Sequence, residues 1–390
     1  MRVGLLTREF PPDVYGGAGV HVEHLAAELA RLVDVVVHCM GGPRPGAIAH
    51  QPWTELAGAN PTLGVLSTDL AMAAAAGDRD LVHSHTWYAS IAGHLAGLLH
   101  GIPHVVTAHS LEPLRPWKAE QLGGGYAISG WCERTAIEAA DAVIAVSEAM
   151  RTDVLRCYPG VPPSRVSVVH NGIDTVRFAP DPGSGALDRL GIDRDRPYLL
   201  FVGRITRQKG LTHLLDAAEL IRANAQLVLC AAAPDTPELG AHVDQRVRDL
   251  ASAGRSVLLV AEPVPRGDLV QLLSHARAFV CPSIYEPLGI VNLEAMACAT
   301  PVVAGRVGGI PEVVADGTTG ILVEVDQDPD GTPRDPARFA ADLAAALDTL
   351  LDDPELADRL GRAGRERAIG EFSWARAAQR TLEVYLQVLA

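Results

Sequence analysis

The chain has 390 residues, of which 48% are hydrophobic and 21% charged, a composition typical of a folded protein with two or three domains. Lysines and arginines number 33 against 47 aspartates and glutamates, giving a net charge of −14. This acidic balance excludes whole-molecule attraction to nucleic acid or anionic membrane. The six cysteines form no C-x-x-C pair, so we expect buried free thiols rather than a zinc cluster or disulfide framework.

Neither a leader nor a membrane span is expected. The apolar segment 2–7 is too short for a signal peptide, and the longest uncharged stretch, between Asp80 and Glu112, contains six histidines and Pro103. We therefore expect a cytoplasmic protein with small-molecule substrates, without nucleic acid or membrane as partners. The oligomeric state stays open, a homo-oligomer included.

In the first half of the chain, short runs rich in β-branched residues alternate with amphipathic helical stretches. Such runs fit strands that are buried on both faces of a parallel sheet. The alternation predicts a doubly wound α/β domain over residues 1–178. The expected strands are 2–7, 33–39, 81–85, 104–109, 142–146 and 166–169, with helices over 20–31, 89–99 and 131–140.

The segment 179–197 is rich in Asp, Pro and Gly and is predicted to be a linker. A second domain of the same α/β class is expected over 198–371. Two Rossmann-like, doubly wound domains would face each other across a deep cleft, with ligands beyond the carboxyl ends of the strands. The expected strands are 198–202, 227–231, 257–260, 278–280, 301–304 and 320–323, with helices over 211–224 and from 336 onward.

Two loops follow strands and offer anion-binding groups. Gly16 and Gly17 lie between the first strand and its helix, where backbone N–H groups can approach an anion; the alternative is a tight turn. Arg204 and Lys209 follow the strand 198–202 without the spacing of a Walker loop. A diphosphate would sit there, and the alternative is a solvated loop.

Glu286 and Glu294 stand eight residues apart. A helix is expected to begin near Leu288 and Gly289, with Glu286 at its mouth and Glu294 within it. Carboxylates there can accept hydrogen bonds from sugar hydroxyls. The alternative is helix capping by Glu286 and a surface position for Glu294.

Ten of the fourteen histidines lie at or before position 109. His83 and His85 form an H-x-H at a strand end, but no acidic or cysteine partner is near in sequence, so a metal is not favoured. We expect His109 to be a hydrogen-bonding residue of the cleft rather than a core histidine. Three Asp-x-Asp triplets, at 78–80, 193–195 and 326–328, are predicted to be solvated loop charge.

Together these features resemble the retaining glycosyltransferases of the GT-B fold, family 4. The resemblance spans nearly the whole chain, and segment 108–125 is similar to actinobacterial members described as glycogen synthases and α-maltose-1-phosphate synthases. It is carried by residues 11–17, 169–174, Gly203-Arg204 with Lys209, Glu286 with Glu294, and 308–312.

The resemblance implies a role for each candidate residue. Arg204 and Lys209 would neutralise the diphosphate of ADP in place of a metal, so that neither metal nor cofactor is needed. Glu286 and His109 would contact the transferred glucose, and Glu294 the ribose. The remaining contacts would come from the N–H groups of Leu288, Gly289 and Ile290, and from Gly16 and Gly17 of the first domain, which helix 372–390 would join.

The implied reaction is retaining α-1,4-glucosyl transfer from ADP-glucose. The acceptor is either glucose 1-phosphate, giving α-maltose 1-phosphate for glycogen synthesis, or the end of an α-1,4-glucan. A non-catalytic nucleotide-sugar sensor is an alternative of another class. Tyr15 and Thr86 stand where larger bacterial glycogen synthases carry lysine and aspartate, and these departures on the acceptor side weaken the case for a glycogen acceptor.

The loop after His109 carries two cations, Arg115 and Lys118. On the resemblance this loop faces the cleft, where the pair can bind a phosphate dianion. Aromatic residues, the usual platforms for a long glucan, make up only 5% of the chain. We therefore expect glucose 1-phosphate to be the better acceptor. The alternative is that the two cations pair with Glu112 and Glu120 on the surface.

Overall fold

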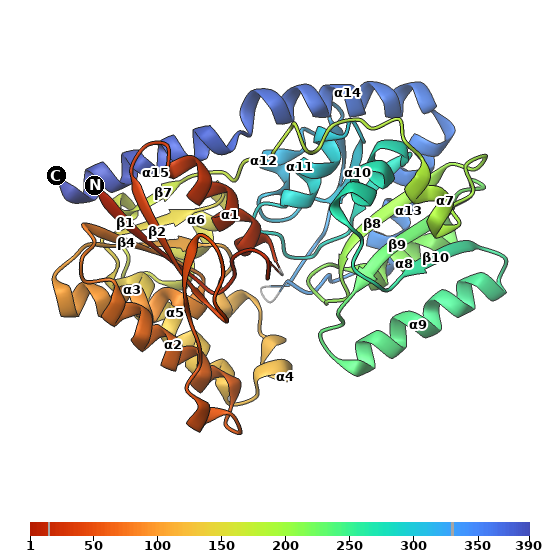
Figure 1. Ribbon diagram of the computed structural model, residues 1–390. Helices are drawn as coiled ribbons and strands as arrows, with labels where there is room; N and C mark the ends of the chain where they lie inside the picture. The colour runs from red at the N-terminus through yellow and green to blue at the C-terminus, as the bar shows by residue number, and fades with distance from the viewer. Residues whose placement is uncertain (15, 329–330) are drawn as a thin grey trace. The chain divides into compact units, whose positions relative to one another are not determined.

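A computed structural model of the protein describes residues 1–14, 16–328 and 331–390. The chain divides into two compact units, residues 1–172 with 374–390 and residues 173–373 (Figure 1). Each unit is a parallel sheet with helices on both faces. Among the described residues, no helix combines the length and the apolar character needed to cross a membrane.

The first unit is built on a seven-stranded sheet in the order β3-β2-β1-β4-β5-β6-β7, with every neighbouring pair parallel. Its strands are β1 Arg2–Thr7, β2 Asp34–Met40, β3 Ala47–His50, β4 Leu81–His85, β5 His104–Ala108, β6 Ala142–Ala145 and β7 Val166–Val168. Its helices are α1 Gly17–Leu29, α2 Pro61–Ala75, α3 Trp87–His100, α4 Lys118–Leu122, α5 Gly125–Ala139, α6 Glu148–Cys157 and α15 Trp374–Leu389, with 3₁₀ turns at Thr54–Leu56, Glu112–Leu114 and Pro163–Arg165.

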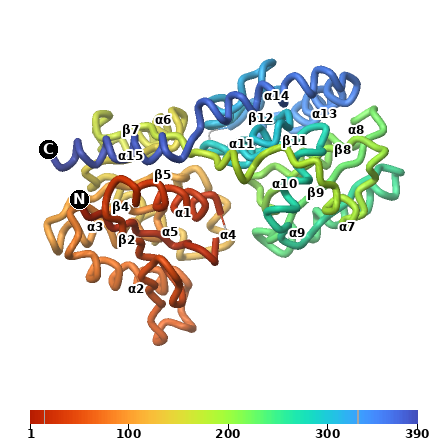
Figure 2. The backbone as a smooth tube through the Cα atoms, turned by 45° about the horizontal axis from the view of Figure 1, so that its top comes forward, coloured from red at the N-terminus to blue at the C-terminus, as the bar shows by residue number. Residues whose placement is uncertain are grey.

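Successive residues of β1 face opposite sides of the sheet, as the period of a strand requires. Leu5 packs into a core formed with α1 and α15, whereas Leu6 packs into a core formed with α2 and α3. All residues of β1 after Arg2 are buried, which explains why its sequence shows no polar alternation. In Figure 2 the last helix, drawn in blue, lies along this unit.

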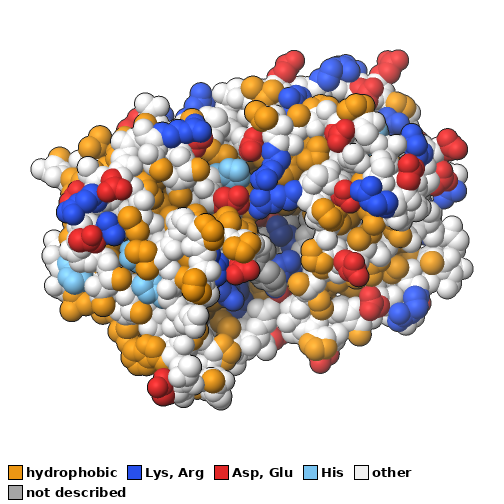
Figure 3. Space-filling model, in the orientation of Figure 1, with side chains coloured by type: hydrophobic (Ala, Val, Ile, Leu, Met, Phe, Trp, Pro, Cys, Tyr) orange, Lys and Arg blue, Asp and Glu red, His pale blue; other side chains and the backbone are white. Residues whose placement is uncertain are grey.

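The second unit contains a six-stranded sheet in the order β10-β9-β8-β11-β12-β13, again parallel throughout. Its strands are β8 Tyr198–Arg204, β9 Gln226–Ala232, β10 Ser256–Val260, β11 Ala278–Cys281, β12 Val302–Gly305 and β13 Gly320–Val323. Its helices are α7 Gly185–Leu190, α8 Leu211–Leu220, α9 Pro237–Ser252, α10 Arg266–His275, α11 Ile290–Ala297, α12 Ile310–Val313, α13 Pro336–Asp352 and α14 Pro354–Glu371. Acidic and basic side chains intermingle on its surface in Figure 3.

In each sheet the order in which successive strands are added reverses at one point, between β1 and β4 in the first unit and between β8 and β11 in the second. Sheets wound outward from a central pair of strands leave a crevice beyond the carboxyl ends of that pair, and ligands bind there. The loops after β1, β4, β8 and β11 are therefore the places to look for function. They include the loops of Gly16 with Gly17, of Arg204 with Lys209, and of Glu286.

The prediction of two Rossmann-like doubly wound domains is confirmed, and β1, β4 and β13 have the predicted bounds. The segment 179–197, expected to be a linker, instead contains helix α7. The N–H of Ala186 in α7 donates to Gln271 of α10 at 2.9 Å. The second unit begins before this segment, at residue 173. The short edge strand β3 was not expected, because four residues give little pattern. The six cysteines are free, as predicted.

Candidate active site

At the switch point of the second unit, a lysine and a glutamate meet. Lys209, in the loop after β8, donates from Nζ to Oε2 of Glu286, in the loop after β11, at 2.6 Å. Ser283 Oγ donates to the same oxygen at 3.2 Å. Glu286 is only 6% exposed. The fold thus joins two of the predicted site residues at the crevice where ligands of such sheets bind.

Glu286 keeps Lys209 in its charged form. Burial lowers the pKa of Lys209, but the charge of Glu286 and the hydrogen bond to it raise the pKa more, so that it lies above the usual value. Arg204 is close enough for its charge to act on Lys209, and its guanidinium donates to Asp235 at 2.7 Å. The loop after β8 therefore presents two cations beside one buried carboxylate.

Two glycines let backbone segments close around this pair. Gly210 has φ +63°, and a Cβ there would lie 2.0 Å from the carbonyl oxygen of Pro282. Gly308 has φ +51°, and a Cβ there would lie 2.1 Å from the carbonyl oxygen of Glu286. Any side chain at either position would push the loop of Glu286 out of place.

Helix α11 begins at Ile290, close to the predicted start. Gly289, which has no side chain to cap the helix, precedes it with φ +93°. Oε2 of Glu286 accepts from Lys209 and Ser283, so this oxygen does not cap the helix. The first N–H groups of a helix have no partner within it. The N–H groups around Leu288, Gly289 and Ile290 are thus available in the loop that carries Glu286.

Glu294 lies within α11, as predicted, and it is partly buried rather than on the surface. Burial raises its pKa to about 7, while the charges of Arg266 and Lys209 act in the opposite direction. The carboxyl group therefore changes its charge near neutral pH, within reach of the field of Lys209.

We expect Glu294→Gln to stabilise the protein at pH 8 by at most about 3 kcal/mol and to have little effect near pH 4.5. The folded pKa of about 7 lies above the ordinary 4.5, so the wild type loses stability as pH rises between these values, and glutamine removes this loss. Calorimetric unfolding of both proteins at the two pH values measures the difference. An equal effect at both would show that Glu294 titrates normally.

Asn292, also on α11, was not singled out from the sequence. Its side chain is fully buried, and neither its amide nitrogen nor its amide oxygen has a hydrogen-bond partner among the described residues. Buried amides are usually paired, so Asn292 departs from the usual pattern. In the sequence, an asparagine between apolar residues gives little reason to single out Asn292. Its burial became known only from the structure.

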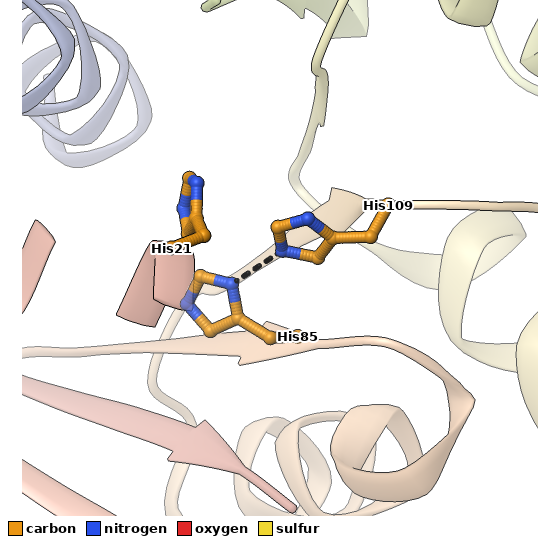
Figure 4. Close-up of side chains that lie close together, drawn as sticks. All are labelled: His21, His85 and His109. Carbon is orange, nitrogen blue, oxygen red and sulfur yellow. Dashed lines mark hydrogen bonds between the residues drawn. The ribbon is translucent and has the colours of Figure 1, made fainter. Parts of the chain in front are cut away.

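In the first unit, three histidines converge from different elements (Figure 4). His21 lies on α1, His85 ends β4, and His109 follows β5. Nδ1 of His85 and Nε2 of His109 are 3.1 Å apart and share a hydrogen bond. Nδ1 of His21 is 2.7 Å from Oδ1 of Asn171. His109 thus lies at a strand end beside other polar groups, and it is partly exposed.

These imidazoles are neutral at physiological pH. Burial lowers the pKa of His21 to about 4, against the raising effect of its hydrogen bond to Asn171. Burial, reinforced by the neighbouring histidines, brings the pKa values of His85 and His109 well below the usual range. His83 is different: its Nδ1 meets the hydroxyl of Tyr385, and its Nε2 that of Thr107, both at 2.6 Å. His83 is a satisfied core histidine.

Arg115 and Lys118 lie around one buried carboxylate. Arg115 forms an ion pair with Glu112, and Nζ of Lys118 is 3.8 Å from the same oxygen. Neither cation is on the surface, since their side chains are 13% and 15% exposed. A third cation, Arg8, lies over the ring of Tyr88 at 4.2 Å, with Lys118 5.6 Å from the same ring. Arg8 had no sequence signal beyond its position after β1.

Burial shifts the pKa values of the charged groups in this cluster. Burial and the charge of Arg115 lower the pKa of Lys118 to about 8, with Arg8 adding to the effect and Glu112 opposing it. Glu133, whose Oε1 accepts from the Glu112 N–H at 2.7 Å, has its pKa raised to about 7 by burial and by the charge of Glu112. Burial is the largest cause of both shifts, with neighbouring charges of the same sign adding to it.

The remaining candidates are less defined. Gly16 is the residue before α1, and its N–H donates to Glu9 at 2.8 Å. Tyr15 lies outside the described residues. Thr86 has φ +63°, a strained value for a residue with a Cβ, directly after His85. The Asp-x-Asp triplets form surface ion pairs, for example Asp80 with Arg2 at 3.3 Å.

Two doubly wound units in one chain, each with polar groups at its switch point, are the architecture of the GT-B glycosyltransferases. The chain belongs to this class: residues 15–177 match the model of Glycosyltransferase Family 4, and residues 187–367 match that of Glycosyl transferases group 1. The resemblance drawn from the sequence is thereby confirmed.

Relatives agree with this assignment. The chain is 58% identical to the α-maltose-1-phosphate synthase of Mycolicibacterium smegmatis, over the full length of both proteins. It is 31% identical to a glycogen synthase of Mycobacterium tuberculosis, over 99% of this chain and 94% of the relative. Among solved structures, the sucrose-phosphate synthase of Thermosynechococcus elongatus is similar, with a TM-score of 0.81 and 25% identity over 99% of this chain and 98% of that one.

Proposed function

We propose that the protein is a retaining α-1,4-glucosyltransferase that moves glucose from ADP-glucose to glucose 1-phosphate, giving α-maltose 1-phosphate. The observation that carries the proposal is the 58% identity, over both full lengths, to a protein described as an α-maltose-1-phosphate synthase. The cations Lys209 and Arg204 in the second unit, and Arg115 and Lys118 in the first, support the proposal independently of that relative.

The donor is proposed to bind in the second unit. Lys209 and Arg204 would neutralise the two phosphates of ADP as the bond to glucose breaks, so that no metal is required. Glu294 would accept hydrogen bonds from the ribose, and the free N–H groups at the start of α11 would hold the distal phosphate or the sugar. Glu286, fixed by Lys209 and Ser283, would contact the glucose.

Retention is proposed to follow from attack on the same face as the leaving group. A double displacement needs a carboxylate placed as a nucleophile beside the anomeric carbon, and Glu286 is instead held by Lys209. In the front-face route the departing phosphate takes the proton of the acceptor hydroxyl while an oxocarbenium-like sugar forms. The protein supplies charge stabilisation, which is the largest catalytic contribution in many enzymes.

The acceptor is proposed to bind in the first unit, at the cluster of Arg115, Lys118 and Arg8. Arg115 and Lys118 lie beside Glu112, and Arg8 is near enough to Lys118 for its charge to act there; such cations would suit the phosphate of glucose 1-phosphate. His109 would contact the transferred glucose. Arg115 and Lys118 already share Glu112, so the phosphate would join an existing ion pair.

We expect Arg115→Ala and Lys118→Ala each to raise the KM for glucose 1-phosphate by about 10-fold or more, since each removes a charged hydrogen-bond donor. The KM for the donor should stay nearly unchanged. Steady-state kinetics with either substrate varied provide the measurement. Arg156→Ala is the matched control, because Arg156 makes a surface ion pair with Asp153 in the same unit. Unaltered acceptor kinetics in both variants would remove these cations from the site.

Product analysis tests the proposed function itself. ADP-glucose and UDP-glucose are each offered with glucose 1-phosphate and with glycogen, and nucleotide release and sugar products are followed. The expected result is α-maltose 1-phosphate from ADP-glucose and glucose 1-phosphate. A higher kcat/KM for glycogen would make the protein a glucan-elongating enzyme instead. Nucleotide-sugar binding without turnover in any combination would make it a sensor.

A further inference from the structure

The three histidines of the first unit offer one ring nitrogen each within 4.8 Å of one another. Their ring centres are 4.6 Å apart for His21 and His109, and 5.2 Å apart for His21 and His85. Figure 4 shows the rings grouped around one small space, and each side chain comes from a different element. This is the one cluster of metal-binding side chains that meets these distances in the described part of the chain.

The hydrogen bonds of the cluster leave lone pairs unused. The amide oxygen of Asn171 can only accept, so Nδ1 of His21 carries the hydrogen and Nε2 has a lone pair. Nε2 of His21 and Nε2 of His85 are both buried and have no partner among the described residues. An imidazole whose second nitrogen donates to a protein oxygen is oriented as metal-binding histidines usually are.

We propose that His21, His85 and His109 bind one divalent transition-metal ion, with zinc the best fit. Imidazole suits zinc, copper and nickel, and three histidines with one open position form a recognised zinc arrangement. Nitrogen ligands of a tetrahedral zinc lie about 3.4 Å from one another, given bonds of about 2.1 Å. Nδ1 of His85 and Nε2 of His109 are 3.1 Å apart and share one hydrogen. Both can bind the ion once that hydrogen bond breaks and each ring carries its hydrogen on its other nitrogen.

The ion is an inhibitor rather than a cofactor. This consequence rests on the proposed function, in which His109 contacts the transferred glucose. A metal bound to the ring nitrogen of His109 removes that contact, so it competes with the donor. Zinc binding itself does not depend on the proposed function, and the two parts are measured separately.

Binding is tested on the full chain, with any affinity tag removed and metals stripped by chelator. Zinc alone is titrated in a calorimeter, and bound metal is counted after desalting. The expected result is one zinc per chain, with affinity weakened at least about 10-fold in His21→Gln. His38→Gln is the matched control: His38 and His50 share a hydrogen bond of 3.1 Å but belong to no three-ligand cluster among the described residues. Equal zinc binding by wild type and His21→Gln would overturn the proposal.

Cobalt gives a test that needs no variant. The wild type with one equivalent of cobalt is expected to show the intense visible absorption of a four-coordinate ion, and its absence would overturn the proposal. Kinetics then address the consequence: zinc should raise the apparent KM for the donor. Stoichiometric zinc with an unchanged KM would leave the metal site standing and remove His109 from the proposed glucose site.

Discussion

Replacing Lys209 with alanine is expected to lower kcat by about 10²–10³, the loss that follows removal of one preorganised charge stabiliser. The lysine lies at the switch point of the second sheet, and its pKa is held above the usual value by Glu286. It is therefore charged at neutral pH, and on the proposed function this charge would stabilise the negative charge that develops on the diphosphate. Arg204→Ala should lower kcat on a similar scale.

Single-turnover and steady-state rates provide the measurement, with Arg246→Ala as the control. Arg246 also makes ion pairs within the second unit, with Asp216 and Glu219, but away from the ends of β8 and β11. Chelation by EDTA should leave activity intact, or raise it where zinc was bound. Activity that is lost on chelation and restored by a divalent ion would contradict the metal-free role of the two cations.

Glu286→Gln is expected to lower kcat by about 10²-fold while changing donor affinity little. The carboxylate is fixed by Lys209 and Ser283. On the proposed function it would act on the glucose as positive charge develops there, and an interaction that strengthens in the transition state appears in kcat. Glutamine keeps the shape and removes the charge. Donor binding is measured separately by calorimetry, so that the two effects are not confused.

Glu294→Gln provides the contrast. Contacts to ribose do not change during transfer, so this variant should raise the donor KM and leave kcat nearly unaltered. The opposite pattern, with kcat lost in Glu294→Gln and KM raised in Glu286→Gln, would mean that the two roles are exchanged. A thermal scan of Glu286→Gln shows whether Lys209, left without its partner, destabilises the second unit.

The strands were predictable because they are buried on both faces. In β1 every residue after Arg2 is buried, so residues 3–6 form an apolar run with clear ends. Strand β4 is also buried throughout, although its last three residues, His83, Ser84 and His85, are polar. The loops after these strands were also located correctly, since chain order fixes which loop follows which strand. Glu286 and Lys209 could each be predicted as a candidate site residue, because each lies in a loop that follows a buried strand.

The partners of the site residues could not be predicted. His21 and Asn171 are 150 positions apart, and no spacing rule joins them. Glu112 looked like a surface partner of Arg115, but it is 1% exposed because the chain around it folds against α5. The linker was misjudged for a related reason: residues suited to turns also begin the short helix α7. Local composition indicates whether a segment favours a turn or a helix. Burial depends on which residues, distant in the sequence, pack against that segment.

The last helix has a consequence for synthesis on the ribosome. The core beneath β1 contains Trp374, Ala377 and Tyr385, and the Tyr385 hydroxyl meets His83, 302 positions earlier. The first unit therefore cannot complete its core while only its own strands have emerged, because the segment that closes it is translated after the entire second unit. Non-local contacts of this kind slow folding, so the second unit is expected to reach its native state first, although its sequence comes later.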